Sequence, residues 1–280
     1  MHTAGNRYWE SQEMLNVANT LAVKAPDSHS IRSLEGKVSA EEWKQRVDLA
    51  ALYRLVALYG WDDLIFTHIS ARVPGPEHHF LINPYGMMFE EITASSLVKI
   101  DTEGNKVEDS PYPVNPAGFT IHSAIHMNRD DAHCVIHLHT VDGVAMASQE
   151  HGLLPISQHA QLVYGDLAYH DYEGVALELG ERERIVADVG AKNVVILRNH
   201  GTLTMGKTCA DAFMRMYYLE KAASMQVRAL AGGSRPYGVN QGVAEKNAAL
   251  SQAAFDGPIS GLAWPALLRK LDRIDPGYKH

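Results

Sequence analysis

A five-residue run, Val135-Ile136-His137-Leu138-His139, constrains the fold of this chain most. Its β-branched and aliphatic residues predict a buried strand. In a strand, positions i and i+2 point to the same face, so His137 and His139 present two imidazoles side by side. This arrangement is half of a possible metal site.

The best candidate for a third imidazole is His200, which follows a second apolar run at residues 194–197. Three neutral imidazoles with open coordination positions suit a catalytic divalent ion, with zinc preferred and manganese, iron or cobalt as alternatives. The pattern alone also allows buried histidines that only satisfy hydrogen bonds. The spacing of the histidines does not distinguish a metal site from hydrogen-bonded buried histidines.

A second histidine pair, His122 and His126, has the i, i+4 spacing that places both rings on one helical face. Such a pair can bind a metal or line a pocket, and it can also form a polar stripe that faces a cavity or solvent. The spacing favours the polar stripe.

Composition restricts the partners. The formal charge is −8 without a basic block, so we expect neither nucleic acid nor a membrane surface as a partner, and a small molecule fits better. No apolar run reaches the roughly 20 residues of a membrane span, and the first residues lack a signal-peptide layout. With only two cysteines, expected to be reduced, the sequence predicts a cytoplasmic protein.

The order of elements predicts an α/β protein with layers around a central mixed or antiparallel sheet. We expect an N-terminal arm at residues 1–36, one domain at 37–231, and a linker with a terminal helix at 232–280. Predicted strands lie at 64–73, 79–82, 97–101, 135–139 and 194–197. Predicted helices lie at 39–60, 115–129, 140–148, 177–189, 209–230 and 262–274.

Several motifs, in a fixed order, resemble the class II aldolase/adducin family, which includes fuculose phosphate aldolase, ribulose phosphate epimerase and the head of adducin. The resemblance covers residues 43–230, about two thirds of the chain, and several motifs look closer to adducin's head than to the sugar aldolases. The motifs are LIFTHISAR, HFLINPYG, TASSLVKID, VNPAGFTIHSAIH, CVIHLHT, HAQLVYGDLAYHDY and VVILRNHGTL.

The resemblance implies a layered αβα fold of the class II aldolase type and assigns His137, His139 and His200 to the family's three metal ligands. It also implies a homo-oligomer, with a tetramer favoured, whose metal pocket lies near a subunit boundary.

The sequence departs from the aldolases at functional positions. Gly118 replaces a carboxylate that serves the aldolases as ligand and acid/base, and Gln161 replaces an aspartate of the epimerase. The phosphate-binding positions of the aldolases also differ, which disfavours a phosphorylated sugar. These positions hold Thr67-His68, Tyr85-Gly86 and Pro116-Ala117.

We therefore predict a lyase that performs retro-aldol cleavage or decarboxylation of a small non-phosphorylated hydroxy-carbonyl or hydroxy-acid compound, through an enolate that the metal stabilises. Candidates for proton transfer are His122, His159 and Tyr85. For His159 a hydrogen bond to a ligand residue, and for Tyr85 a ring packed at a turn, are the structural alternatives.

Two other functions remain open on sequence grounds. One is a non-catalytic, adducin-like binding or scaffold module, which Gly118 and the closeness to adducin's head favour. The other is a mononuclear iron oxygenase that uses the same three histidines.

Overall fold

The computed structural model describes residues 31–174, 180–233 and 235–280. Within these ranges, seven strands form one sheet in the order β3-β2-β1-β4-β7-β6-β5. Every neighbouring pair is antiparallel except β5 and β6, which are parallel. The strands are β1 (His68–Arg72), β2 (Phe80–Ile82), β3 (Val98–Ile100), β4 (Cys134–Leu138), β5 (Leu167–His170), β6 (Val194–Leu197) and β7 (Gly201–Gly206). The predicted α/β class with a largely antiparallel sheet is confirmed.

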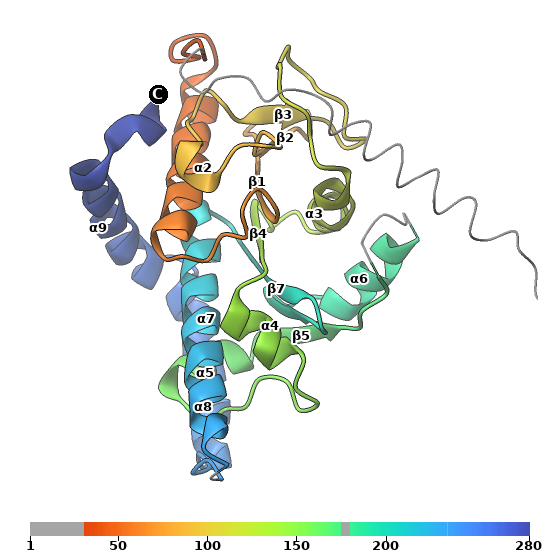
Figure 1. The fold of residues 1–280 in the computed structure, drawn as a ribbon, viewed down its shortest axis with the longest axis vertical. Coiled ribbons are helices and arrows are strands. Elements are labelled where there is room, and N and C mark those ends of the chain that lie inside the picture. Colours follow the sequence, from red (N-terminus) through yellow and green to blue (C-terminus); the bar gives the residue numbers. More distant parts are fainter. Residues whose placement is uncertain (1–30, 175–179, 234) are drawn as a thin grey trace, which may run out of the picture.

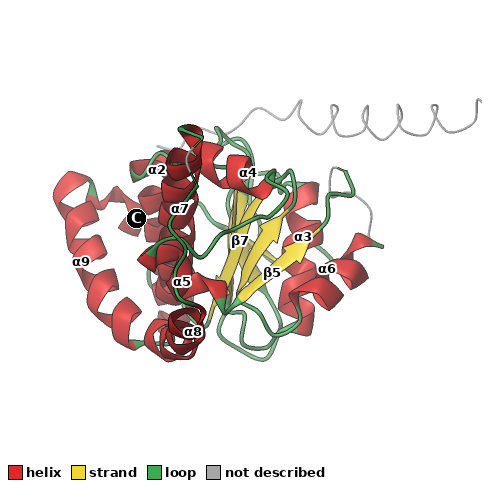
Figure 2. Cartoon of the chain, turned by 90° about the horizontal axis from the view of Figure 1, so that it is seen from below, coloured by secondary structure: helices red, strands yellow, loops and turns green. Residues whose placement is uncertain are grey.

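Helices cover both faces of this sheet (Figure 2). One face carries α3 (Pro116–Asn128) and α6 (Glu181–Val189), which contact each other. The opposite face carries the long helix α7, and α8 and α9 pack on the helices of that layer (Figure 1). The helices on this second side are α2 (Ala40–Leu58), α4 (Val141–Ala147), α5 (Gln158–Tyr164), α7 (Cys209–Ala231), α8 (Gln241–Phe255) and α9 (Pro258–Ile274). Two short 3-10 turns are η2 (Phe89–Glu91) and η3 (Pro276–Lys279).

Strand β4 divides its side chains between the two layers. Cys134, Ile136 and Leu138 belong to the large core beneath α2 and α7. Val135 belongs to the smaller core beneath α3 and α6. Because side chains alternate along a strand, His137 shares the face of Val135 and lies on the α3 side. The apolar alternation of β4 therefore fixes which face of the sheet carries the histidines.

Four observed elements differ from the sequence prediction. Residues of β5 and α5 fall where a loop was predicted, and α8 falls within the predicted linker. Strand β7 was not predicted, because its sequence begins and ends with glycine, at Gly201 and Gly206, and contains only two large apolar residues. Its pairing with both β4 and β6 supplies the hydrogen bonds that local propensity does not.

The predicted N-terminal arm lies mostly outside the described residues, as does the start of the helix predicted at 177–189. Cys134 and Cys209 are buried free cysteines, as expected. Among the described helices, none combines the length and the apolar character needed to cross a membrane.

Candidate metal centre and pocket

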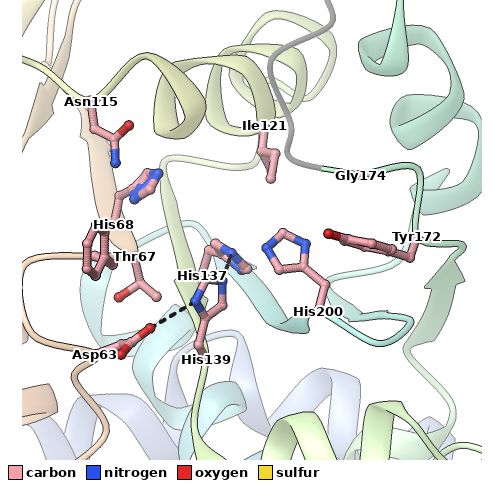
Figure 3. Close-up of a pocket in the computed structure, with 11 residues that line it drawn as sticks. Asp63, Thr67, His68, Asn115, Ile121, His137, His139, Tyr172, Gly174 and His200 are labelled. Atoms are coloured by element: carbon pink, nitrogen blue, oxygen red, sulfur yellow. Dashed lines mark hydrogen bonds and ion pairs between the residues drawn. The ribbon is translucent and has the colours of Figure 1, made fainter. Parts of the chain in front are cut away.

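Three histidines converge at one end of the central strands (Figure 3). His137 is in β4, His139 follows its end, and His200 lies in the turn between β6 and β7. Their nearest ligand nitrogens all lie within 4.8 Å of one another. His200 reaches this position because β7, which begins at the next residue, pairs with β4. The structure thus brings together the three predicted ligands.

Hydrogen bonds determine which ring nitrogen of His137 and of His139 carries the proton. His137 Nδ1 lies 3.1 Å from the Thr202 carbonyl oxygen, and His139 Nδ1 lies 3.2 Å from Asp63 Oδ2. Both oxygens accept, so each Nδ1 is the donor and each neutral ring keeps a lone pair on Nε2. These two Nε2 atoms are 3.0 Å apart. Two facing lone pairs repel at this distance unless a cation lies between them, so the donor set fits a metal ion.

Burial keeps the rings of His137 and His200 neutral. It lowers the pKa of His137 well below its usual value, with neighbouring histidines adding to the effect. Burial, with His139 and His170 nearby, lowers the pKa of His200 to about 4. Only a neutral imidazole has a lone pair for a metal, so the environment favours the ligand form at neutral pH.

A pocket of about 350 Å³ opens beside the three histidines. Phe66 and Tyr172 are exposed wall residues, and the Tyr172 ring centroid lies 6.0 Å from that of His200. No lysine or arginine lines the pocket within the described ranges. Besides the three histidines, its walls are Asp63, Phe66, Thr67, His68, Asn115, Ile121, Tyr172 and Gly174.

Thr67 and His68 form a buried polar wall of this pocket. Thr67 has a φ of +64°, a conformation that costs energy for a β-branched residue. Its Oγ1 and the Nδ1 of His68 have no hydrogen-bond partner among the described residues. Burial lowers the pKa of His68 well below its usual value, so this wall carries no positive charge at neutral pH.

The His122–His126 pair is buried beneath this wall and hydrogen-bonded. Ser70 Oγ lies 2.6 Å from His122 Nδ1 and 2.7 Å from His126 Nε2. His126 Nδ1 lies 2.8 Å from the Ala132 carbonyl oxygen. Burial lowers the pKa of each ring to about 3. His122 stacks on His68, with ring centroids 5.5 Å apart, but is not itself a wall residue.

The other two proton-transfer candidates lie away from the pocket wall. His159 is in α5, in the α7 layer, with its ring 5.3 Å from that of Tyr218. Tyr85 follows β2, where its backbone amide donates to the Pro113 carbonyl, and burial raises its pKa. Gly118 lies in α3, but the side-chain surroundings of residues 116–120 are outside the described part.

Sequence reasoning missed Asp63, Phe66, Asn115, Ile121 and Tyr172 as wall residues. Asp63 could not be found from spacing, because it reaches His139 across 76 residues of sequence. The sequence analysis noted His68 only because it differs from the aldolases at a phosphate-binding position. In the structure it pairs directly with His137 in the β1–β4 register, which places both rings on one face.

The fold and the site together define an α/β protein with a three-histidine pocket at the end of its central strands. Residues 47–227 match the family described as Class II Aldolase and Adducin N-terminal domain, and the chain belongs to this family. The resemblance predicted from the motifs is confirmed.

Individual relatives agree with this assignment. A Caulobacter vibrioides protein, assigned by name to the class 2 aldolases, is 61% identical over 246 residues, which cover 88% of this chain and 96% of the relative. The crystal structure of an aldolase II superfamily protein from Pseudomonas syringae has a TM-score of 0.85 at 48% identity, covering 89% of this chain and 100% of that chain. Mouse alpha-adducin is 45% identical over 194 residues, which cover 68% of this chain but 26% of the adducin.

Proposed function

We propose that this protein is a metal-dependent carbon-carbon lyase that acts on a small non-phosphorylated hydroxy-carbonyl or hydroxy-acid compound. The observation that carries the proposal is the pair of facing Nε2 atoms of His137 and His139, with His200 beside them. Membership of the class II aldolase family and the name of the Caulobacter relative support it.

His137, His139 and His200 would hold the metal, for which we propose zinc, with manganese, iron or cobalt as alternatives. A bound divalent ion supplies Lewis-acid stabilisation of the negative charge that develops on a substrate oxygen when the carbon-carbon bond breaks. Thr202 and Asp63 orient two of the three rings through their Nδ1 atoms.

The walls of the pocket support a substrate without phosphate. With no lysine or arginine in the described lining, a phosphate would have no cationic side chain to pair with. Phe66 and Tyr172 offer apolar surface at the mouth, which suits a compact and even aromatic substrate.

We further propose His122 as the proton-transfer group, because it is the candidate that contacts a wall residue, His68. The roles predicted for His159 and Tyr85 remain predictions.

The test combines metal analysis with anaerobic assays of purified protein on a panel of hydroxy-acids, with L-fuculose 1-phosphate as the phosphorylated comparison. We expect one divalent ion per chain and cleavage without oxygen, both lost in His137→Ala. His151→Ala, which removes an exposed histidine, is the control. Absence of stoichiometric metal, together with no effect of His137→Ala, would refute the lyase proposal. Turnover that requires oxygen would favour the iron oxygenase.

A second candidate is a non-catalytic, adducin-like binding module, which the 45% identity to alpha-adducin favours. This alternative predicts that the metal-loaded protein turns over no compound in the panel.

We also propose a cytoplasmic homo-oligomer, with a tetramer favoured. The exposed pocket residues Phe66 and Tyr172, together with Val141, which follows His139 by two residues and is 85% exposed, support an association surface there. Light scattering on the purified protein in solution tests the oligomeric state.

A further inference from the structure

Glu220 is a buried carboxylate of α7 that binds two hydroxyl groups from separate segments of the chain. It accepts hydrogen bonds from the Thr202 hydroxyl, at 2.8 Å, and from the Thr140 hydroxyl. Glu220 is 2% exposed, and among the described residues no lysine, arginine or histidine forms an ion pair with it. We name Glu220, Thr140 and Thr202 the carboxylate bridge.

Both threonines of the carboxylate bridge lie next to ligand histidines. Thr140 directly follows His139 in the chain. Thr202, in β7, supplies the carbonyl oxygen that accepts from His137 Nδ1 at 3.1 Å. The bridge therefore joins the end of β4 to the start of β7, which are the segments that carry the ligands or flank them.

The bridge lies on the face of the sheet opposite the metal pocket. Thr202 pairs with Leu138 in the β4–β7 register, and Leu138 belongs to the core beneath α7. Paired residues of a sheet point to the same face, so the Thr202 side chain points toward α7 while His137 points toward α3. Glu220 is not among the lining residues of the pocket. It can therefore influence the ligands only through the backbone of the two threonines.

The backbone of α4 packs closely on the bridge. Thr140 Oγ1 accepts from the Gly143 amide at 3.0 Å, while the Thr140 hydroxyl donates to Glu220. A Cβ on Gly143 would lie 2.5 Å from Thr140 Oγ1 and 3.0 Å from Glu220 Oε1. This packing leaves Thr140 and Glu220 little freedom to move apart from each other.

Fold stability alone does not explain a carboxylate at this position. Burying a charged group away from water costs free energy, and apolar groups that replace a buried hydrogen-bonded set of the same shape can be neutral or stabilising. Burial raises the pKa of Glu220 to about 7, which reflects this cost. Hydrogen bonds are directional, so the carboxylate fixes the separation of two hydroxyls in a way that an apolar side chain does not.

We infer that Glu220 is a positioning residue of the metal centre, which fixes the end of β4 relative to the start of β7 and thereby the arrangement of the three ligand histidines around the ion. The inference rests on the part of the proposed function that places a metal on these histidines, and it is independent of the reaction.

The effect of the bridge reaches the ligands in two ways. A shift of Thr202 moves the carbonyl oxygen that orients His137, and a shift of Thr140 moves the residue that follows His139. Groups that hydrogen-bond directly to ligand histidines typically change metal affinity about 10- to 100-fold. Glu220 acts one bond further out, so we expect an effect at the lower end of this range.

Glu220→Met tests the inference, because methionine has a similar length, favours helices and is only a weak acceptor. We expect about tenfold lower affinity for zinc, measured on the folded protein by competition with a chromogenic chelator. The visible absorption spectrum of the cobalt-loaded protein, which reports ligand geometry, should change as well. Glu220→Gln, which keeps an acceptor for Thr202 and can donate to Thr140 Oγ1, should restore most of the affinity. Wild-type zinc affinity and an unchanged cobalt spectrum in Glu220→Met would overturn the inference.

Gln226→Met is the matched control on the same helix. Gln226 is also buried, and its side chain accepts from the Leu154 amide and donates to the Gly152 carbonyl, in a loop that carries no ligand. This variant should lower the free energy of unfolding, because buried hydrogen bonds are lost, but leave the zinc affinity and the cobalt spectrum unchanged. Equal losses of zinc affinity in the two methionine variants would show general destabilisation and contradict the inference.

Thr202→Val tests the bridge from its other side and decides the inference if Glu220→Met does not fold. Valine keeps the shape of threonine and the backbone carbonyl that accepts from His137, but it lacks the hydroxyl. We expect weaker zinc binding, and no further loss when Glu220→Met is added, because both changes break the same bridge. Wild-type zinc affinity in Thr202→Val would overturn the inference.

The outcomes separate this inference from the proposed reaction. Zinc affinity that depends on Glu220 in a protein that cleaves no compound supports the inference and counts against the lyase. Cleavage with zinc affinity that is unchanged in Glu220→Met and Thr202→Val overturns the inference alone. A wild-type protein that binds no zinc overturns both.

Discussion

The Asp63 carboxylate lies 3.2 Å from His139 Nδ1, so a residue before β1 orients a histidine that follows β4. Carboxylates that bind the far nitrogen of a ligand histidine fix its tautomer and raise its basicity. Asp63 is partly exposed, with its side chain 45% accessible, so its effect on His139 is that of a partly solvated hydrogen bond.

We predict that Asp63→Ala lowers affinity for zinc about 10- to 100-fold, the usual effect of removing such a partner. Competition with a chromogenic chelator measures this change. Asp62→Ala is the matched control, because Asp62 lines a separate hollow beside Arg54. Equal zinc affinity of the two variants would show that Asp63 does not support the site.

Gly201 permits the close approach of β7 to β4 next to the histidines. A Cβ at this position would overlap the Leu138 carbonyl oxygen and lie 3.0 Å from a ring carbon of His139. We expect Gly201→Ala to lower the free energy of unfolding by about 1–3 kcal/mol, as overpacking does, and to weaken zinc binding. Urea unfolding and chelator competition measure both effects. Gly232→Ala, where no atom lies within 4 Å of the new Cβ, should change neither.

Glu220 makes stability depend on pH. Burial raises its pKa to about 7 from an ordinary value of 4.5, although hydroxyls of Thr140 and Thr202 donate to the carboxylate. Between these two values the native state holds a proton that the unfolded state has lost. The contribution of Glu220 to the free energy of unfolding therefore falls as pH rises from 4.5 to 7 and then levels off.

We predict that Glu220→Gln, which cannot ionise, gains stability relative to wild type as pH rises from 5 to 8, by at most about 3 kcal/mol. Urea unfolding of the metal-free proteins at both pH values measures the difference. Glu183→Gln, at an exposed position of α6, should show no such trend. A pH-independent difference between Glu220→Gln and wild type would contradict the assignment.

Trp264 anchors α9 to the rest of the protein. It is 8% exposed, its ring lies 6.1 Å from that of Phe213, and its Nε1 donates to Asp48 at 3.2 Å. We expect Trp264→Ala to cost about 3–5 kcal/mol of the free energy of unfolding, measured by denaturant titration. Leu262→Ala, in the same helix at 82% exposure, should stay within about 0.5 kcal/mol of wild type. Similar losses in both variants would mean that α9 is stabilised by something other than Trp264.

Local signals predicted a large part of the fold. Ser39 and Thr140 cap α2 and α4 by accepting backbone hydrogen bonds at positions where those helices were expected to start. Pro116 begins α3, as its preference for the first helical position predicts. These features depend on residues within one helical turn of each other, so the sequence displays them directly.

The site was predictable to a smaller extent. The alternation of VIHLH placed His137 and His139 on one face, and the position of His200 after an apolar run made it a candidate. The proton positions were not predictable, since they depend on Thr202, Asp63 and Ser70, which contact the histidines from other segments of the chain.

By itself, the sequence determined the family, the buried strand with its two histidines, and most of the helix starts, because each of these follows from local pattern or from ordered motifs. Only the tertiary structure decided that β7 pairs with β4, that His68 lies opposite His137, and that His122 lies behind His68. Such relationships depend on which strands become neighbours, and strand pairing is set by packing across the whole sheet, not by the period of any one segment.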